Sequence, residues 1–159
     1  MTMERPSERA AFLVWGSCDG VALSAIEELL LEFIEMRIFK SKKFARFAEE
    51  EDISDAMLLA AVGRAQRGLI DADLGGGVIK QRIPRQGSGR SGGYRVILAF
   101  RTEHRTFFLH GYAKNSMDNI SAHEVRTFRK AAKILLELSD AVLEQQLDGG
   151  SFIEVETHE

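Results

Sequence analysis

Two neighbouring segments of alternating hydrophobicity constrain the fold more than any other feature of the sequence. Residues 94–101 place apolar side chains at every second position, and residues 105–114 do the same after a short polar link. Alternation with a period of two is typical of a strand that buries one face, and so short a link predicts an antiparallel hairpin. Any fold proposed for this chain must therefore contain a β-sheet built on this pair.

The register of this pair decides which side chains share a face. Keeping one face apolar requires Tyr94 opposite Ala113 and Leu98 opposite Leu109. The other face then groups the polar side chains of both segments: Arg95, His110, Tyr112 and Lys114. Lys114 lies on the diagonal from Arg95, within roughly 8 Å. We therefore expect one polar, basic face on this hairpin.

Helical periodicity flanks these strands. Apolar residues at helical spacing predict helices over residues 41–51, 54–69, 121–138 and 139–149, with a further acidic helix over residues 24–35. Capping serines are predicted at Ser24, Ser54, Ser121 and Ser139. Further strands are predicted over residues 78–83, 37–39 and 152–155, and residues 71–77 are expected to form a turn. The pattern indicates an α+β fold, with an N-terminal helix hairpin on one face of a small, mostly antiparallel sheet, C-terminal helices, and a second face that is basic and open.

The charged residues are segregated along the chain. The net charge of the 159 residues is −3, yet residues 36–133 carry +9, and both flanking parts are acidic. Within residues 78–114, eight basic side chains accompany a single acid, Glu103. Cations that project from successive strands to one face repel one another unless a polyanion neutralises them. We therefore predict a phosphate-binding face on these strands.

Cleavage of RNA by its own 2′-hydroxyl needs a proton acceptor, stabilisation of charge at phosphorus and a proton donor for the leaving 5′-oxygen. Four basic side chains are candidates for charge stabilisation: Lys80, Arg82, Arg95 and Lys114. His110 and Tyr112 are the titratable candidates on the same face, with a lysine as the alternative and His104 as a weaker candidate. Further side chains expected to contact RNA are Arg85, Arg90 and Arg101.

Several other classes of function find no support in the sequence. No run approaches the roughly 18 apolar residues that span a bilayer, so we expect a cytoplasmic protein without a membrane partner. The single cysteine, Cys18, and four scattered histidines lack the spacing of a metal site, and we expect no metal and no cofactor. The glycine-rich segment 87–92 matches GxGxxG, but it precedes a strand instead of opening a helix and does not predict a nucleotide site.

Several long, ordered motifs resemble the toxins of the RelE/ParE superfamily, in its RelE- and HigB-like branch. They are MRIFKSKKFARFA at residues 36–48, ISDA at 53–56, GLIDADLGGGVIKQR at 68–82, GRSGGYR at 89–95 and FFLHGYAKNSMDNI at 107–120. The resemblance begins at Met36 and runs nearly to the end of the chain. It implies a RelE-like toxin domain over residues 36–159.

The resemblance implies the toxin of a type II toxin–antitoxin system. Such a toxin is an mRNA endonuclease that cuts messages in the ribosomal A site, works without a metal and is neutralised by a cognate antitoxin. The family's basic positions fall on Lys80, Arg82, Arg95 and Lys114, followed by Asn115. Some relatives end in a catalytic tyrosine or a short basic tail, whereas this chain continues into an acidic helix, so the acid and base are not assigned by the resemblance.

Alternatives remain open at this point. The ParE branch of the same superfamily inhibits DNA gyrase without cutting RNA, and an inactive antitoxin-binding module is a third interpretation. The cluster of cations on the predicted strands favours the nuclease. Residues 1–35 lie outside the resemblance. They are either a translation of sequence upstream of the natural start or an acidic helix that covers a basic or apolar patch.

Overall fold

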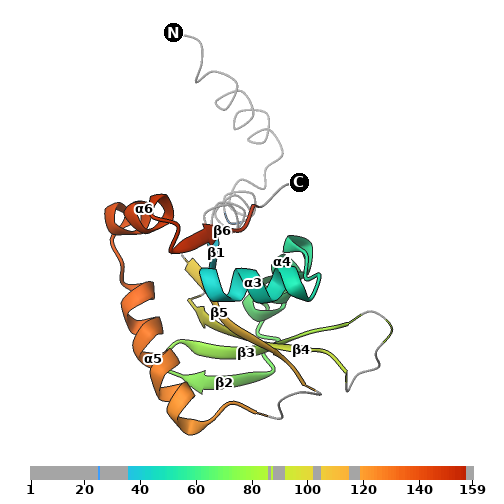
Figure 1. Cartoon of the computed structure of the whole chain (residues 1–159). Coiled ribbons are helices and arrows are strands. Elements are labelled where there is room, and N and C mark those ends of the chain that lie inside the picture. The colour runs from blue at the N-terminus through green and yellow to red at the C-terminus, as the bar shows by residue number, and fades with distance from the viewer. Residues whose placement is uncertain are drawn as a thin grey trace, which may run out of the picture. The chain divides into compact units, whose positions relative to one another are not determined.

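The computed structural model describes residues 36–85, 87, 92–101, 105–114 and 119–156, together with Ala25. Within this part the chain forms one six-stranded sheet and four longer helices (Figure 1). The strand order is β2-β3-β4-β5-β1-β6, and all neighbours are antiparallel except β1 and β5. The elements, in chain order, are β1 (Arg37–Ser41), α3 (Lys42–Glu50), α4 (Asp55–Gln66), β2 (Ala72–Gly75), β3 (Val78–Ile83), β4 (Tyr94–Phe100), β5 (Arg105–Ala113), α5 (Ala122–Leu136), α6 (Asp140–Asp148) and β6 (Phe152–Glu154).

The sheet is covered on both faces, which confirms the α+β class and corrects one expectation about its layers. Helices α3 and α4 pack on one face, over Val96 and Leu98 of β4. Helices α5 and α6 pack on the other, over Ile97 and Ala99 (Figure 1). The expectation of an open second face was therefore wrong for the part under α5 and α6. The physical reason is visible in β4, where residues 96–100 are all apolar and buried, as in a strand enclosed by two layers.

Serine caps start helices α3 to α6, as the sequence predicted for α4, α5 and α6 but not for α3. The side chains of Ser41 and Ser54 accept hydrogen bonds from the backbone of the first turns of α3 and α4, and Ser139 does the same for α6. Ser121 and Glu124 form the complete capping box expected at α5. Helices α3 and α4 follow each other closely but rest mainly on different strands, α3 on β5 and β1 and α4 on β3. The two helices of the expected hairpin therefore pack side by side on the same face of the sheet, each on different strands.

The register of β4 and β5 is confirmed at one end and wrong at the other. Tyr94 lies opposite Ala113 and Ile97 opposite His110, as predicted. Beyond Ile97 a bulge shifts the pairing, so that Leu98 lies opposite Phe108 instead of Leu109. A bulge adds one residue to one strand and is invisible to a count of alternating positions. The part of the hairpin that carries the polar side chains is the part that was placed correctly.

Strand β2 was missed, because the sequence suggested only a turn over residues 71–77. It is four residues long, lies at the edge of the sheet and shifts its register against β3 between Asp73 and Gly75. Gly75, Gly76 and Gly77 all have positive φ angles, which explains why so many glycines adjoin a strand. A short edge strand with a bulge carries no alternating pattern that a sequence reading can detect.

Gly111 of β5 allows α3 to approach the sheet. A Cβ atom added there would lie 2.3 Å from Cε1 of Phe47, whose ring packs edge-on against Tyr94. We expect Gly111→Ala to lower the free energy of unfolding by about 1–3 kcal/mol, because the Phe47 ring must move from its contact with Tyr94 and the added Cβ also lies 3.1 Å from the ring of buried Phe44. Denaturant unfolding measures the change. Gly63→Ala in α4 is the control, since its Cβ would meet nothing within 4 Å, and it should preserve or raise stability.

Candidate functional site

The sheet brings most of the predicted polar side chains to one face. Residues directly opposite each other on neighbouring strands point to the same side. The pairing across β3, β4 and β5 therefore forms two parallel rows: Arg82, Arg95 and Tyr112 in the first, and Lys80, Ile97 and His110 in the second. We call these six residues the polar rows. They lie on the face that α5 packs against: Ile97 belongs to the apolar cluster beneath the helix, and His110 stacks on Phe128 of α5.

Two guanidinium groups of the first row converge beside Gly93. A Cβ atom at Gly93 would lie 3.3 Å from Nε of Arg82 and 3.7 Å from Nη1 of Arg95. The nearest atom to such a Cβ is the carbonyl oxygen of Ile83, at 2.8 Å, so the missing side chain of Gly93 leaves room for β3 and for the Arg82 side chain. Two like charges side by side on neighbouring strands are unfavourable in isolation. Their convergence is chemically sensible where an anion such as a phosphate binds between them.

Buried polar contacts on the opposite face hold β3 in place. The side chain of Gln81 is buried, donates from Nε2 to the carbonyl oxygens of Ala61 and Leu69, and accepts at Oε1 from the backbone of Asp71. Arg64 of α4 donates to the carbonyl oxygen of Arg82. These contacts fix β3, and with it the alternation that turns Lys80 and Arg82 toward the other face. Sequence reasoning missed Gln81, although a polar residue at a core-facing position of a strand was a signal.

Arg95 has a carboxylate neighbour that the sequence analysis did not foresee. Its Nε lies 3.6 Å from Oδ2 of Asp71, and the Arg95 side chain is 11% exposed. The expectation of cations without acidic partners on this face is therefore wrong for Arg95. Asp71 lies immediately before the missed strand β2, which explains why it was not considered. At 3.6 Å and partly exposed, the pair is a loose one that a phosphate group can replace.

His110 is held beneath α5 in a neutral form. Its ring stacks on Phe128, with 5.7 Å between centroids, and its Nε2 is buried without a hydrogen-bond partner among the described residues. Burial lowers the pKa of His110 below its usual 6.5, and the charge of Lys43 lowers it further, whereas Glu124 opposes the shift. At neutral pH the imidazole is therefore uncharged and able to accept a proton.

The pKa of Tyr112 is shifted in the opposite direction from that of His110. Burial raises the pKa of its phenol above the usual 10.0, while the charge of Arg95 acts in the other direction. Its hydroxyl is buried and has no hydrogen-bond partner among the described residues. The His110 and Tyr112 rings lie 6.0 Å apart between centroids. The site thus holds a proton acceptor and a proton donor side by side, with pKa values moved apart by their surroundings.

Two lysines lie close to the paired guanidinium groups: Lys80 within the second polar row, and Lys114 just beyond the rows. Nζ of Lys80 lies 3.4 Å from Oδ1 of Asn119, which precedes α5. Lys114 is exposed just beyond β5, and its backbone donates to the carbonyl oxygen of Gly93 at 3.1 Å. Lys114 therefore lies next to the point at which the two guanidinium groups converge.

The other predicted RNA contacts are not gathered at this site. Arg85 lies over the ring of Tyr94, 5.7 Å from its centroid, and that ring faces α3. Arg101 follows the far end of β4 from Arg95, so the structure does not bring it to the polar rows. Arg90, His104 and Asn115 lie outside the described residues, as does Cys18.

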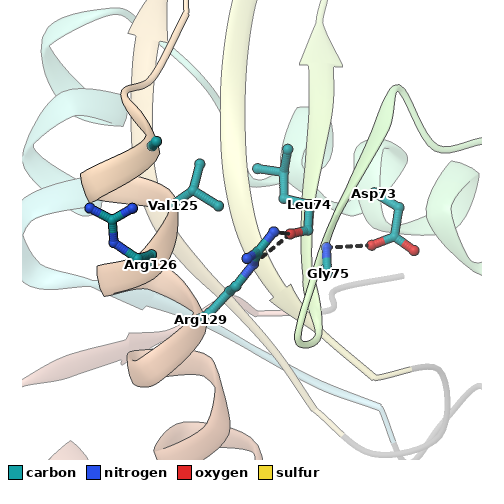
Figure 2. A pocket seen from close by; sticks show the side chains of 7 residues that line it. Asp73, Leu74, Gly75, Val125, Arg126 and Arg129 are labelled. Carbon is teal, nitrogen blue, oxygen red and sulfur yellow. Dashed lines mark hydrogen bonds between the residues drawn. The ribbon is translucent and has the colours of Figure 1, made fainter.

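A separate groove lies between β2 and α5, away from the polar rows (Figure 2). It has a volume of about 780 Å³ and is lined mainly by Leu74, Val125, Arg126 and Arg129. Figure 2 shows Arg129 reaching from α5 to the carbonyl oxygen of Leu74, which it binds from Nε at 2.7 Å. Arg129 thus caps the edge strand β2. Among the residues that the structure describes, the lining of this groove includes no His, Tyr or Lys.

Two further observations concern the described residues. No three of their His, Cys, Asp or Glu side chains lie close enough together to hold a metal ion. None of their helices combines the length and apolar character needed to cross a membrane. In a comparison with known families, the model of the RelE toxin of the RelE/RelB toxin–antitoxin system matches residues 36–155. The match covers β1 through β6 and both polar rows.

Proposed function

The chain belongs to the RelE toxin family, and on that premise we propose that it is a ribosome-dependent endonuclease that cuts mRNA and inhibits translation. Membership makes it the toxin of a toxin–antitoxin system and implies an antitoxin protein as its partner. The finer proposal includes mRNA on the ribosome as substrate, the cytoplasm as the place of action and a reaction without a metal cofactor.

The convergence of Arg82 and Arg95 beside Gly93, in one row with Tyr112, carries this proposal. A phosphodiester seated there would meet two guanidinium groups, which match phosphate geometry well. Lys80 and Lys114 flank the same position. The ParE-like inhibition of DNA gyrase, the alternative interpretation, does not require this cluster of cations.

The residues of the polar rows can assist each step of RNA transesterification. His110 accepts the proton of the 2′-hydroxyl, whose oxygen then attacks the neighbouring phosphorus. Arg82, Arg95 and Lys80 stabilise the negative charge that builds on the phosphoryl oxygens. The bond from phosphorus to the 5′-oxygen breaks, and Tyr112 gives its proton to that oxygen. The products are a 2′,3′-cyclic phosphate and a 5′-hydroxyl end, so that no water and no redox partner is consumed.

Inducing the chain in cells without its antitoxin tests the proposal. We expect translation to stop and primer extension to show cuts at defined positions within codons of cellular mRNA. A DNA supercoiling assay on the same cells should give a normal result. Intact messages together with blocked gyrase would establish the ParE-like alternative. Intact messages with unaffected gyrase would instead indicate an inactive antitoxin-binding module.

A further inference from the structure

The carboxylate of Asp71 lies beside the arginine in the middle of the first polar row. Its Oδ2 is 3.6 Å from Nε of Arg95, and the Asp71 side chain is 40% exposed. A carboxylate next to a phosphate site repels the anion that the site binds. Asp71 therefore weakens the binding of RNA, unless it contributes to the site in another way.

A buried side chain of β3 holds Asp71 in this place. Oε1 of Gln81 accepts a hydrogen bond from the backbone nitrogen of Asp71 at 3.0 Å. Gln81 is itself buried and donates from Nε2 to two backbone carbonyl oxygens. In the chain it lies between Lys80 and Arg82, the two basic residues that β3 contributes to the polar rows. Asp71 is thus tied to the strand that carries these cations, while its carboxylate reaches Arg95 of β4.

Asp71 and the proposed phosphate lie at different nitrogen atoms of Arg95. Asp71 is near Nε, whereas Nη1 lies 3.5 Å from the carbonyl oxygen of Tyr94 and 3.7 Å from the place that a Cβ of Gly93 would take. A guanidinium group is planar and donates along fixed directions. Contacts at Nε and at Nη1 together therefore set the orientation of the whole group. Because the contact with Asp71 is long, the group can still adjust when a phosphate arrives.

Arg95 needs such a contact because Arg82 lies opposite it. The two residues pair across β3 and β4, and their guanidinium groups converge beside Gly93. Before the substrate binds, their like charges repel each other, and the repulsion favours conformations in which Arg95 turns away. A carboxylate at Nε of Arg95 offsets this repulsion in the free protein.

We propose that Asp71 is a positioning residue of the cleavage site, which holds the guanidinium group of Arg95 toward the phosphate through Nε. Asp71 acts through Arg95 and makes no contact with the RNA. Its cost in affinity for the anion is offset in the transition state, where an oriented guanidinium group stabilises the developing charge. The inference rests on the proposed function and deepens it, because it adds a residue to the same site.

Cleavage on programmed ribosomes, measured as separate values of kcat and KM, tests the role of Asp71. We expect Asp71→Asn to lower kcat by roughly 10- to 100-fold, the effect of misplacing a group that contacts the transition state. KM should not rise, because the substitution removes a charge that repels RNA. Asp71→Glu keeps the charge and should recover part of the lost kcat.

Asp73→Asn is the matched control for this measurement. It removes the same charge two residues along the chain, and its amide oxygen can still accept the hydrogen bond that Asp73 accepts from the backbone of Gly75 at 2.8 Å. Its kcat should equal that of the native protein. An unchanged kcat with a lower KM in Asp71→Asn would overturn the inference, because Asp71 would then only compete with the phosphate.

The side chain of Arg95 gives a second measurement, which does not depend on cleavage. In isotope-labelled protein, its Nε–H signal is identified by its absence in Arg95→Lys. We expect this signal to have a high heteronuclear NOE in the native protein and in Asp73→Asn, and a low one in Asp71→Asn. Such a loss of order, in a chain that cuts no mRNA, would support the role of Asp71 and reject the nuclease. An equally ordered signal in the native protein and Asp71→Asn would reject the inference.

Discussion

Replacing Arg95 with alanine is expected to lower mRNA cleavage by roughly 10²- to 10³-fold, the usual loss when one preorganised group that stabilises transition-state charge is removed. Arg95 occupies the middle of the first polar row, between Arg82 and Tyr112. Its side chain is largely enclosed, so it is already oriented before substrate arrives. Lysine at this position should restore only part of the activity, because an ammonium group cannot form the two parallel hydrogen bonds that a guanidinium forms with a phosphate.

Single-turnover cleavage on programmed ribosomes measures this effect. The free energy of unfolding should fall by only about 1 kcal/mol, because the carboxylate of Asp71 is loosely placed beside Arg95 and stays solvated when the arginine is removed. Arg67→Ala is a matched control, since Arg67 is exposed at the end of α4, on the opposite side of the sheet. Full toxicity of Arg95→Ala at unchanged stability would remove the physical basis of the proposed reaction.

The sequence contained enough information to place the polar rows but not their surroundings. Alternation along residues 94–101 and 105–114 fixed which side chains share a face, because a shift by one residue would have buried Arg95. Serine caps located the starts of α4, α5 and α6 for the same local reason: the cap bonds the backbone within three residues. Local patterns of this kind do not depend on how distant elements pack.

The features that were missed all depend on distant contacts. The bulge at Leu109 lies where the pairing of β5 with the distant strand β1 ends, at Phe108. The loose pair of Asp71 and Arg95 depends on Gln81, which holds the start of β2 from a buried position. A small pocket between α3 and β5 needs the close approach of Phe47 to Gly111. Each joins segments that are far apart in the chain, so only the folded structure brings them together.

Replacing His110 with glutamine is expected to lower cleavage by roughly 10²- to 10⁴-fold, the range for loss of a positioned proton acceptor. The pKa of His110 is lowered from its usual 6.5 by burial and by the charge of Lys43, so the imidazole stays neutral at pH 7. Cleavage by the native protein should therefore decline as the pH falls through that lowered pKa. Tyr112, whose pKa is raised above 10.0, keeps its proton on the alkaline side. The pH profile should show a broad plateau, and His110→Gln should abolish its acid limb.

Charged groups around His110 should set the pH at which the acid limb of the cleavage profile lies. Lys43 from α3 lowers the pKa of the imidazole, and Glu124 from α5 raises it; Arg46 and Glu50 line the pocket between α3 and β5 together with His110. Lys43→Gln should therefore move the acid limb to higher pH, and Glu124→Gln should move it to lower pH. Lys42→Gln, which alters the charge of α3 outside the pocket, should move it little. If the acid limb keeps its position in all these variants, a group other than His110 produces it. A purely structural His110 could change the cleavage rate, but the pH of the acid limb would then not depend on the charges of Lys43 and Glu124.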